Sequence, residues 1–382
     1  MTEIINGVFY CGVRDVDRRM FDELIPLPQG TSYDSYFVRG SEKTALIDTA
    51  YPRCVEDFFR EIAEIECLDY VVALHGEQDH SGCLPQVLEK FPEALVLTNA
   101  TCKKLIMDAL PIAEDKFRVV ADNEEIPLGD KALRFLHAPW VHWGDTMFAY
   151  IPEDGVIFTT DFLGAHTSHF DVFSHEGTET LKLAKRYYAT IMMPFRSFCV
   201  KHLRRIRELS PQWIMPAHGG VYRNPDFILK AYEEWTSDIC PRKVLIPMVS
   251  MYGNTAKMVE YLAEALQHRG FEPIVADAGD LGTISEHLAD AHTIVFAASM
   301  VLAGPHPAMA NVAYLANLLK PKAKCLAVIG SYGWGGKLTE RLAAQITQIK
   351  PEFLGEVLAK GAPNAETFTA LDTLADKIVA AY

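Results

Sequence analysis

Two patterns of hydrophobic residues divide the chain. From about Val8 to His218, short β-like runs alternate with turn residues, and Val55–Ile65 carries hydrophobic residues at helical spacing. The predicted strands are Ser35–Val38, Thr44–Ile47, Tyr70–Leu74, Leu95–Thr98, Leu133–Leu136, Met147–Ile151, Val156–Thr159 and Trp213–Met215. This mixture predicts an α+β fold, a layered sandwich, for residues 1–240.

After Cys240, strands and helices alternate strictly. The predicted strands are Val244–Val249, Pro273–Ala278, Thr293–Ala298, Lys324–Ile329 and Phe353–Leu358. The predicted helices are Thr255–His268, Ala308–Leu319, Thr339–Ile349 and Glu366–Ala381. Nearly continuous hydrophobic strands between helices are typical of a parallel sheet covered on both faces. Residues 241–382 are therefore predicted to form a doubly wound α/β domain with a five-stranded parallel sheet.

Length and composition agree with two globular domains. A chain of 382 residues exceeds the roughly 250–300 residues at which single cores stop growing. Lys and Arg number 36 and Asp and Glu 50, so the net charge of −14 argues against nucleic acid or an anionic membrane surface as a partner. No hydrophobic stretch reaches the ~18–20 residues of a membrane span, and the N-terminus lacks an export signal. We expect a cytoplasmic protein.

The eight cysteines argue against one class of metal site. None of them forms a C-x-x-C pair. Zinc ribbons, rubredoxin-type iron sites and most iron–sulfur clusters use such close pairs. The cysteines are therefore expected to be buried, inert thiols.

The most informative segment of the first domain is His75-Gly76-Glu77-Gln78-Asp79-His80, which directly follows a predicted strand. Its loop geometry can direct residues 75 and 77 toward one ion and residues 79 and 80 toward another. Three further candidate ligands lie downstream, at His142, Asp161 and His218. Surface loops would explain a single histidine, but this spacing favours a metal site. The other nearby histidines, His137, His166 and His169, are expected to support the site or lie at the surface.

This ligand set resembles that of the metallo-β-lactamase fold, which implies an αββα sandwich. Zinc hydrolases of that fold usually have His where this chain has Glu77, and a carboxylate there favours iron over zinc. On this interpretation His75, Glu77 and His142 hold one iron, and Asp79, His80 and His218 hold the other. Asp161 would bridge the two. Because carboxylates also bind zinc, a binuclear zinc hydrolase with a flavodoxin docking module is the alternative.

The second domain carries two loops typical of a flavin site. Ser250–Thr255 follows a strand and opens a helix, where backbone N–H groups and hydroxyls can surround a phosphate. The loop resembles the flavodoxin phosphate loop, and Gly330–Gly336 follows the fourth strand at the same edge of the sheet. The predicted FMN-binding residues are Ser250, Met251, Tyr252, Gly253, Asn254, Thr255, Ser299, Met300, Ser331, Tyr332, Gly333, Trp334, Gly335 and Gly336.

Together the two domains resemble the flavodiiron proteins, also called A-type flavoproteins, which include rubredoxin:oxygen oxidoreductases and nitric oxide reductases. The resemblance implies reduction of O2 to water, of NO to N2O, or of both, with FMN and a non-haem diiron centre. It implies a head-to-tail homodimer in which the FMN of one chain lies beside the irons of the other. Within Lys185–Phe195, which is close to a family string, Tyr188 and Phe195 are expected to line the substrate pocket.

The chain departs from the family pattern at two places. Many members have His after the Phe of an R-x-F segment near the N-terminus, and here Asp22 follows Arg19-Met20-Phe21. The loop Ser299–Pro305 also differs from the usual string. No rubredoxin or flavin-reductase extension is visible, so an external electron donor such as rubredoxin is expected. A flavodoxin-type electron carrier with a vestigial first domain is a third interpretation.

Overall fold

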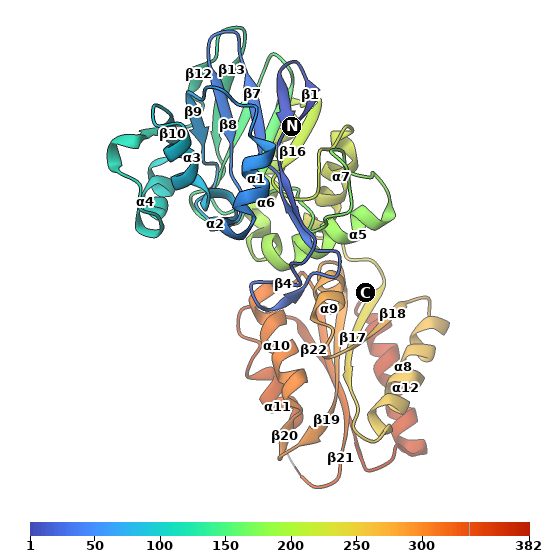
Figure 1. Cartoon of the computed structure of the whole chain (residues 1–382). Coiled ribbons are helices and arrows are strands. Elements are labelled where there is room, and N and C mark those ends of the chain that lie inside the picture. Colours follow the sequence, from blue (N-terminus) through green and yellow to red (C-terminus); the bar gives the residue numbers. More distant parts are fainter. Residues whose placement is uncertain (336) are drawn as a thin grey trace. The chain divides into compact units, whose positions relative to one another are not determined.

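The computed structural model describes residues 1–335 and 337–382 and divides into two compact units (Figure 1). The first unit contains Met1–Tyr188 and Phe195–Thr236, and the second contains Ala189–Pro194 and Ser237–Tyr382. The predicted boundary at residue 240 lies close to this division.

The first unit is built on two stacked sheets. The larger sheet has the order β1-β2-β7-β8-β9-β10-β11, and the smaller has the order β12-β13-β14-β15-β16. The strands of the larger sheet are Thr2–Ile5, Val8–Tyr10, Tyr36–Arg39, Thr44–Ile47, Tyr70–Val72, Leu95–Thr98 and Phe117–Val119. Those of the smaller are Glu125–Pro127, Ala132–His137, Met147–Ile151, Val156–Thr160 and Trp213–Pro216. Two short antiparallel pairs lie outside these sheets: β3 (Val13–Asp15) with β6 (Thr31–Tyr33), and the hairpin of β4 (Met20–Phe21) with β5 (Ile25–Pro26).

Helices cover the outer faces of both sheets. They are α1 (Val55–Glu61), α2 (Gln78–Ser81), α3 (Leu84–Lys90), α4 (Ala100–Ala109), α5 (Thr178–Tyr187), α6 (Arg196–Leu209) and α7 (Pro225–Thr236). One core lies between the sheets, where Val38 and Val72 pack with Phe135 and Phe158. A second core joins the larger sheet to α1, α3 and α4. On the far face of the smaller sheet, the Phe148 ring lies against His202 of α6. The predicted αββα sandwich is confirmed.

The second unit has a parallel sheet with the order β18-β17-β19-β21-β22. These strands are Glu272–Asp277, Lys243–Val249, Thr293–Val301, Cys325–Tyr332 and Glu352–Lys360. The short β20 (Gly304–Pro305) pairs antiparallel with β19. The helices α8 (Asn254–His268) and α12 (Ala365–Ala380) pack on one face, while α9 (Leu281–Leu288) and α10 (Pro307–Leu319) pack on the other (Figure 1). The prediction of a doubly wound, flavodoxin-like domain is confirmed.

Most predicted elements occur within one or two residues of their expected limits. Larger differences occur at Val55–Ile65, where α1 ends at Glu61, and at β19 and β21, which run three residues beyond the predicted Ala298 and Ile329. The helix predicted over Thr339–Ile349 is only α11, Leu338–Ala343, and the following residues leave the helical conformation. The helix α9 had not been predicted. Among the described residues, no helix is both long and apolar enough to cross a membrane.

Candidate metal centre and flavin site

The predicted ligand motif starts where β9 ends. Glu77 has extended backbone angles and is the N-cap of the short helix α2, whose first turn carries Asp79 and His80. His75 and Glu77 flank Gly76, and their side chains meet, with His75 Nε2 3.2 Å from Glu77 Oε2. The helical turn then directs Asp79 and His80 to a second position. The change from extended to helical backbone thus divides the motif into two pairs.

The first group consists of His75, Glu77, His142 and Asp161. Glu77 Oε2 lies 3.2 Å from His75 Nε2 and 3.4 Å from His142 Nε2. Asp161 Oδ2 lies 3.6 Å and 3.4 Å from the same two nitrogens. Two ligands of one ion, each bound at roughly 2.1 Å, stand about 3.0–3.5 Å apart. The spacing of this group therefore fits one metal ion.

The second group consists of Asp79, His80 and His218. His80 Nε2 lies 3.3 Å from Asp79 Oδ1, and His218 Nε2 lies 3.4 Å from Asp79 Oδ2. Asp161 Oδ1 lies 3.1 Å from His80 Nε2 and 3.2 Å from His218 Nε2. Asp161 thus presents one carboxylate oxygen to each group, which is the arrangement predicted for a bridging ligand.

Two carboxylate oxygens in the cluster show that the residues fit metal ions. Asp79 Oδ1 and Asp161 Oδ2 are buried and have no hydrogen-bond partner among the described residues. Burying an unpaired carboxylate oxygen is costly. Cations placed between these oxygens and the imidazoles would satisfy them. The ligand set, four imidazoles and three carboxylates, suits iron and also binds zinc.

The electrostatics of the cluster point to the same conclusion. Burial would lower the pKa of His75, but hydrogen bonds to Asp145 and Glu77 raise it well above its usual value. Burial would raise the pKa of Asp161, but the charge of His80 and the neighbouring imidazoles of His142 and His218 hold it well below its usual value. Without metal, protons on the imidazoles therefore balance the buried carboxylates, and metal ions would replace those protons.

Groups behind the imidazoles fix their orientation. His75 Nδ1 lies 3.1 Å from Asp145 Oδ2, and the Gly76 N–H donates to the same oxygen at 2.7 Å. His218 Nδ1 donates to the backbone carbonyl of Ser32. With Nδ1 engaged in this way, Nε2 is left free to bind metal. Sequence reasoning missed Asp145, which lies three residues after His142.

Replacing Asp145 by Asn is expected to lower metal affinity about 10–100-fold, because the His75 ring loses the carboxylate that orients it and raises its basicity. Competition with a chelator of known affinity measures the effect. Asp108→Asn, an exposed change on α4, is the matched control and should leave affinity unchanged. Equal affinity of the two variants would contradict the orienting role.

A buried carboxylate supports the loop that carries His218. Gly219 and Gly220 have φ values of +93° and +87°, and a Cβ on either would meet atoms nearer than 3.0 Å. Asp34 Oδ2 accepts the Gly220 N–H at 2.9 Å, and Asp34 Oδ1 accepts the Tyr10 hydroxyl at 2.8 Å. Burial raises the pKa of Asp34 to about 6, although these two hydrogen bonds oppose the shift.

The raised pKa of Asp34 predicts a pH-dependent stability. Its ordinary value is 3.8, so its contribution is complete below about pH 3.8 and is lost as pH rises through about 6. Asn cannot titrate. In metal-free protein, the unfolding free energy of wild type minus that of Asp34→Asn should fall by roughly 2.4 kcal/mol between pH 4 and pH 7. Denaturant unfolding at fixed pH measures this difference, and a constant difference would disprove the assignment.

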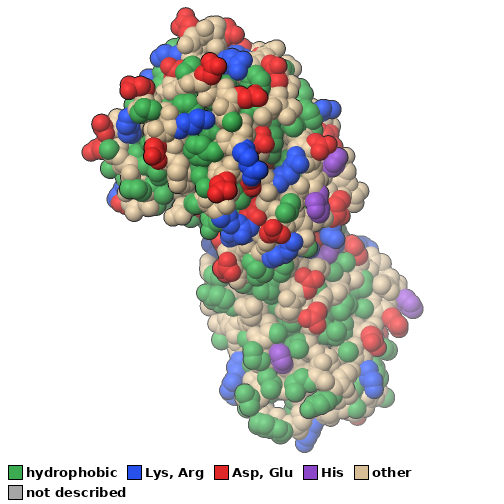
Figure 2. Space-filling view, viewed as in Figure 1, with side chains coloured by type: hydrophobic (Ala, Val, Ile, Leu, Met, Phe, Trp, Pro, Cys, Tyr) green, Lys and Arg blue, Asp and Glu red, His purple; other side chains and the backbone are tan. Residues whose placement is uncertain are grey.

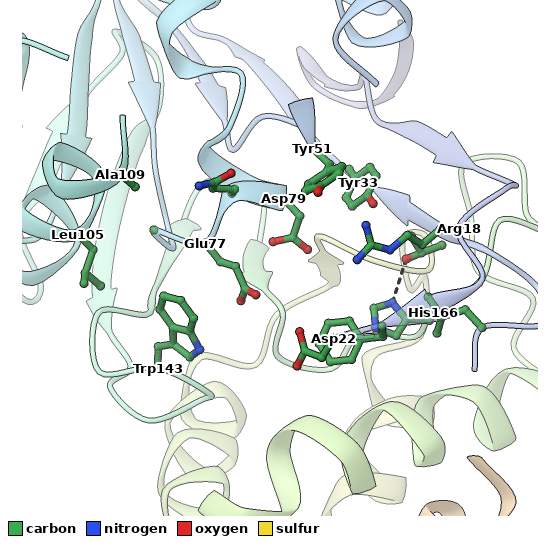
Figure 3. A pocket seen from close by; sticks show the side chains of 15 residues that line it. Arg18, Asp22, Tyr33, Tyr51, Glu77, Asp79, Leu105, Ala109, Trp143 and His166 are labelled. Carbon is green, nitrogen blue, oxygen red and sulfur yellow. Dashed lines mark hydrogen bonds between the residues drawn. The ribbon is translucent and has the colours of Figure 1, made fainter. Parts of the chain in front are cut away.

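A cavity of about 420 Å³ opens above Glu77 and Asp79 (Figure 3). Its wall comes from several elements, among them the β4–β5 hairpin, α4 and the loop that carries Trp143. Its lining residues are Arg18, Phe21, Asp22, Leu27, Thr31, Tyr33, Tyr51, Gly76, Glu77, Gln78, Asp79, Leu105, Ala109, Trp143 and His166. The wall combines aromatic and aliphatic side chains with the Arg18 guanidinium and three carboxylates, those of Asp22, Glu77 and Asp79.

Two predicted pocket residues do not reach this cavity. Tyr188 is fully buried, and its hydroxyl donates to the Trp235 carbonyl at 3.4 Å. The Phe195 ring stacks on Trp140, with centroids 6.1 Å apart. Tyr187 instead donates to Asp161 Oδ1 at 2.9 Å. The buried positions of α5 are Thr180, Ala184 and Tyr187. This helical spacing directs Tyr187 toward the ligand cluster and the next residue, Tyr188, away from it.

The three histidines not expected to be ligands lie outside both ligand groups. His137 Nε2 lies 3.1 Å from the Val120 carbonyl, and His169 is exposed. His166 lines the cavity, with Nδ1 2.9 Å from Thr31 Oγ1. Burial, together with the charge of His218, lowers the pKa of His166 to about 3. This ring is therefore neutral near pH 7.

The second unit has a cleft of about 450 Å³ at the carboxyl ends of its strands. It is lined by Met251, Tyr252, Asn254, Ser299, Met300, Val301, Leu302, Ala303, Ser331, Tyr332, Gly333, Trp334 and Gly361. Of the predicted FMN-binding residues, Ser250, Gly253, Thr255 and Gly335 do not line it, and Gly336 lies outside the described residues. Val301, Leu302 and Ala303 belong to the loop Ser299–Gly304, which the sequence predicts as the remaining wall of the site, whereas Gly361 is not predicted.

Ser299 and Ser331 line this cleft, and the buried Thr255 hydroxyl lies behind them. Thr255 Oγ1 lies 3.0 Å from Ser331 Oγ and 3.5 Å from Ser299 Oγ. Ser299 Oγ also accepts the Met251 N–H at 3.1 Å, and Ser250 Oγ accepts the Ala256 N–H at 3.2 Å. The start of α8 and three hydroxyl-bearing loops therefore meet in one cradle, which suits a phosphate.

The rim of the cleft is apolar and exposed. Tyr252 and Leu302 are each 87% exposed and Trp334 is 70% exposed. Figure 2 shows hydrophobic side chains gathered at this end of the second unit. Leu302 and Ala303 have φ values of +49° and +59° and form the turn between β19 and β20. A cradle for phosphate beside exposed aromatic rings suits a flavin mononucleotide.

Comparison with known proteins agrees with both sites. The family model described as "ODP family beta lactamase" matches residues 32–219. The chain is 30% identical to coenzyme F420H(2) oxidase of Methanothermobacter marburgensis, over 88% of this chain and 87% of that protein. It is 29% identical to nitric oxide reductase of Moorella thermoacetica, over 92% of this chain and 91% of that protein.

Solved structures resemble the whole chain. Rubredoxin oxygen:oxidoreductase of Desulfovibrio gigas matches with a TM-score of 0.94 and 26% identity, covering 100% of this chain and 98% of that one. The flavodiiron protein of Giardia intestinalis matches in fold with a TM-score of 0.92 and 24% identity, covering 100% and 97%. The chain belongs to the flavodiiron protein family. The family name specifies a flavin and two irons, and this flavodiiron chain has one cleft and one cluster that fit them.

Proposed function

We propose that this chain is an oxidoreductase that reduces O2 to water, NO to N2O, or both, with electrons from an external donor. One observation carries the proposal: Asp161 presents its two oxygens to two separate ligand groups in a chain that also has a flavin cleft. The named relatives, an oxidase, a nitric oxide reductase and a rubredoxin oxygen:oxidoreductase, support it.

The proposed ligands are the seven residues predicted from the sequence. His75, Glu77 and His142 would hold one iron, Asp79, His80 and His218 would hold the other, and Asp161 would bridge them. Bound iron would supply a redox-active binding site for a diatomic molecule, and bound FMN would supply electrons from the donor. The chain's own residues position these groups and surround the substrate.

The cavity residues determine what reaches the cluster. Phe21, Leu27, Leu105 and Trp143 make an apolar approach that suits an uncharged diatomic molecule. His166 is held neutral and bonded to Thr31, so it packs against the site without adding charge. The Tyr187 hydroxyl donates a hydrogen bond to Asp161 Oδ1. Apart from the ligands, the charged groups of the cavity wall are Arg18 and Asp22.

A binuclear zinc hydrolase remains the alternative for the same ligands, since zinc also binds His and carboxylate. The comparisons do not favour it, because the named relatives are oxidoreductases. Metal analysis of protein made with both metals available separates the two functions. We expect about two irons per chain and consumption of O2 or NO by the reduced protein. Two zinc ions without gas consumption would contradict the proposal.

We also propose that the chain works as a homodimer. Its electron donor is proposed to be a small redox protein such as rubredoxin. Exposed aromatic residues occur both beside the flavin cleft, at Trp334, and near the metal loop, at Trp140 and Trp143. Exposed apolar surface of this kind is typical of an interface. The mass in solution tests the dimer. A monomer with full turnover would contradict it.

A further inference from the structure

The cavity above the metal cluster contains one carboxyl group that no ligand group uses. Asp22 lines the cavity, and its side chain is exposed at the mouth. Figure 3 shows Asp22 and Glu77 on facing sides of the cavity. Among the described residues, the Asp22 carboxylate has no hydrogen-bond or ion-pair partner. It therefore contacts solvent on one side and the cavity on the other.

The backbone holds Asp22 at this position. The β4–β5 hairpin pairs Phe21 with Ile25, and the Leu24 N–H donates to the Phe21 carbonyl at 2.9 Å. Asp22 and Glu23 form the turn with φ values of +50° and +51°, a region that non-glycine residues seldom occupy. Buried Ile25 and the Phe21 ring, 4.8 Å from the ring of His166, anchor the hairpin.

Partial burial at the wall of the cavity favours the protonated form of Asp22 and is the main cause of its raised pKa. In the metal-free protein the carboxylates of Glu77 and Asp79 raise the pKa further, while His142 and Arg18 oppose the shift. These groups face Asp22 from the metal motif, the His142 loop and its own hairpin. Asp22 is therefore protonated at a higher pH than an ordinary aspartate.

Five of the other titratable groups of the cavity are unsuited to moving protons. His166 is neutral near pH 7 because its pKa is lowered to about 3. Burial raises the pKa of Tyr33 well above its usual value. Arg18 does not lose its proton. Glu77 and Asp79 belong to the proposed metal ligands. Asp22 is left as the carboxyl that can exchange protons between solvent and cavity.

We propose that Asp22 is the proton relay of the cavity: its carboxyl passes protons from solvent to the substrate above the metal ligands. The inference rests on the proposed function, which consumes protons. Reduction of O2 to two waters takes four electrons and four protons, and coupling of two NO to N2O and water takes two of each. The external donor supplies the electrons. Asp22 gives one proton at a time and regains it from solvent, so it is unchanged after turnover.

The test compares Asp22→Asn with Glu23→Gln. Asn keeps the size of the side chain and tolerates the left-handed turn, but it has no proton to give. Glu23→Gln removes one negative charge from the neighbouring turn position, which does not line the cavity. The reduced protein is mixed with O2 or NO, and its reoxidation rate is measured against pH and in D2O.

We expect Asp22→Asn to slow reoxidation about 10–100-fold where Asp22 is protonated. The ratio of wild-type to variant rates should shrink as pH rises and Asp22 loses its proton. Glu23→Gln should match wild type, and Asp22→Glu should restore most of the rate. The iron content and the reduction of the flavin by the donor should be the same in all variants, because Asp22 is no ligand.

Three results would overturn the inference. Equal rates of Asp22→Asn and Glu23→Gln at every pH would exclude a relay. A slowing of Asp22→Asn that is independent of pH and of D2O would indicate a structural role. Loss of iron from Asp22→Asn would indicate a ligand. If wild type itself consumes neither gas, the proposed function fails and the inference fails with it, which the wild-type measurement alone shows.

Discussion

Replacing Asp161 by alanine is expected to remove iron from both metal positions. The rate of O2 or NO reduction should then fall at least about 100-fold. The two oxygens of this carboxylate lie 3.1–3.6 Å from the Nε2 atoms of His75, His80, His142 and His218. Loss of a group that only orients a metal ligand already costs about 10–100-fold in affinity. Loss of a ligand shared by both ions should cost more. Iron content by elemental analysis and turnover with O2 and NO measure the effect.

The same variant changes the metal-free protein. Asp161 helps to raise the pKa of His142 to about 9 and the pKa of His218 well above its usual value. Without it, the buried imidazoles lose a neutralising partner and their pKa values should fall. Tyr187→Phe removes only the hydrogen bond to Asp161 Oδ1 and should keep both irons. An Asp161→Ala protein that retains two irons per chain and full turnover would refute the bridging role.

Replacing Gly330 by alanine is expected to weaken FMN binding by about 10–100-fold while leaving the iron content intact. A Cβ on Gly330 would lie 2.1 Å from the Ala298 carbonyl oxygen and 2.9 Å from Leu338 Cδ2. Because Ala298 pairs with Gly330 and Ser299 with Ser331, β21 must move away from β19. The Thr255, Ser299 and Ser331 hydroxyls then separate. Overpacking of this kind costs about 1–3 kcal/mol, which is the expected loss of affinity.

The control is another glycine-to-alanine change. A Cβ on Gly177, in the first unit, meets nothing within 4 Å, so Gly177→Ala should bind FMN and iron as wild type does. Titration of the apoprotein with FMN, followed by flavin fluorescence, measures affinity. Unchanged FMN affinity of Gly330→Ala would show that the cradle does not hold the phosphate. Loss of iron along with FMN would show that the effect is not confined to the second unit.

Periodicity located the strands well, because each sheet buries a regular face. Thr44–Ile47, Leu95–Thr98 and Met147–Ile151 occur at their predicted limits. The ligand motif could also be predicted, since extended and helical backbone each fix where successive side chains point. His75 and Glu77 meet in one group and Asp79 and His80 in the other.

What could not be predicted depends on contacts between distant segments. Asp145 becomes important only because its loop returns beside His75, seventy residues earlier in the chain. Tyr187 contacts the ligand cluster where Tyr188 was expected, because the buried spacing of α5 includes Tyr187. The extent of α11 and the Leu302–Ala303 turn depend on local backbone conformations that the hydrophobic pattern does not determine.

Anaerobic single turnover of the fully reduced protein tests the central claim most directly. FMN hydroquinone carries two electrons and two ferrous ions carry one each, which suffices for about one O2 per chain. We predict that O2 or NO reoxidises the flavin within the turnover, with water or N2O as product and without release of hydrogen peroxide. A flavin that stays reduced under both gases, or one that releases about one peroxide per FMN, would contradict the account.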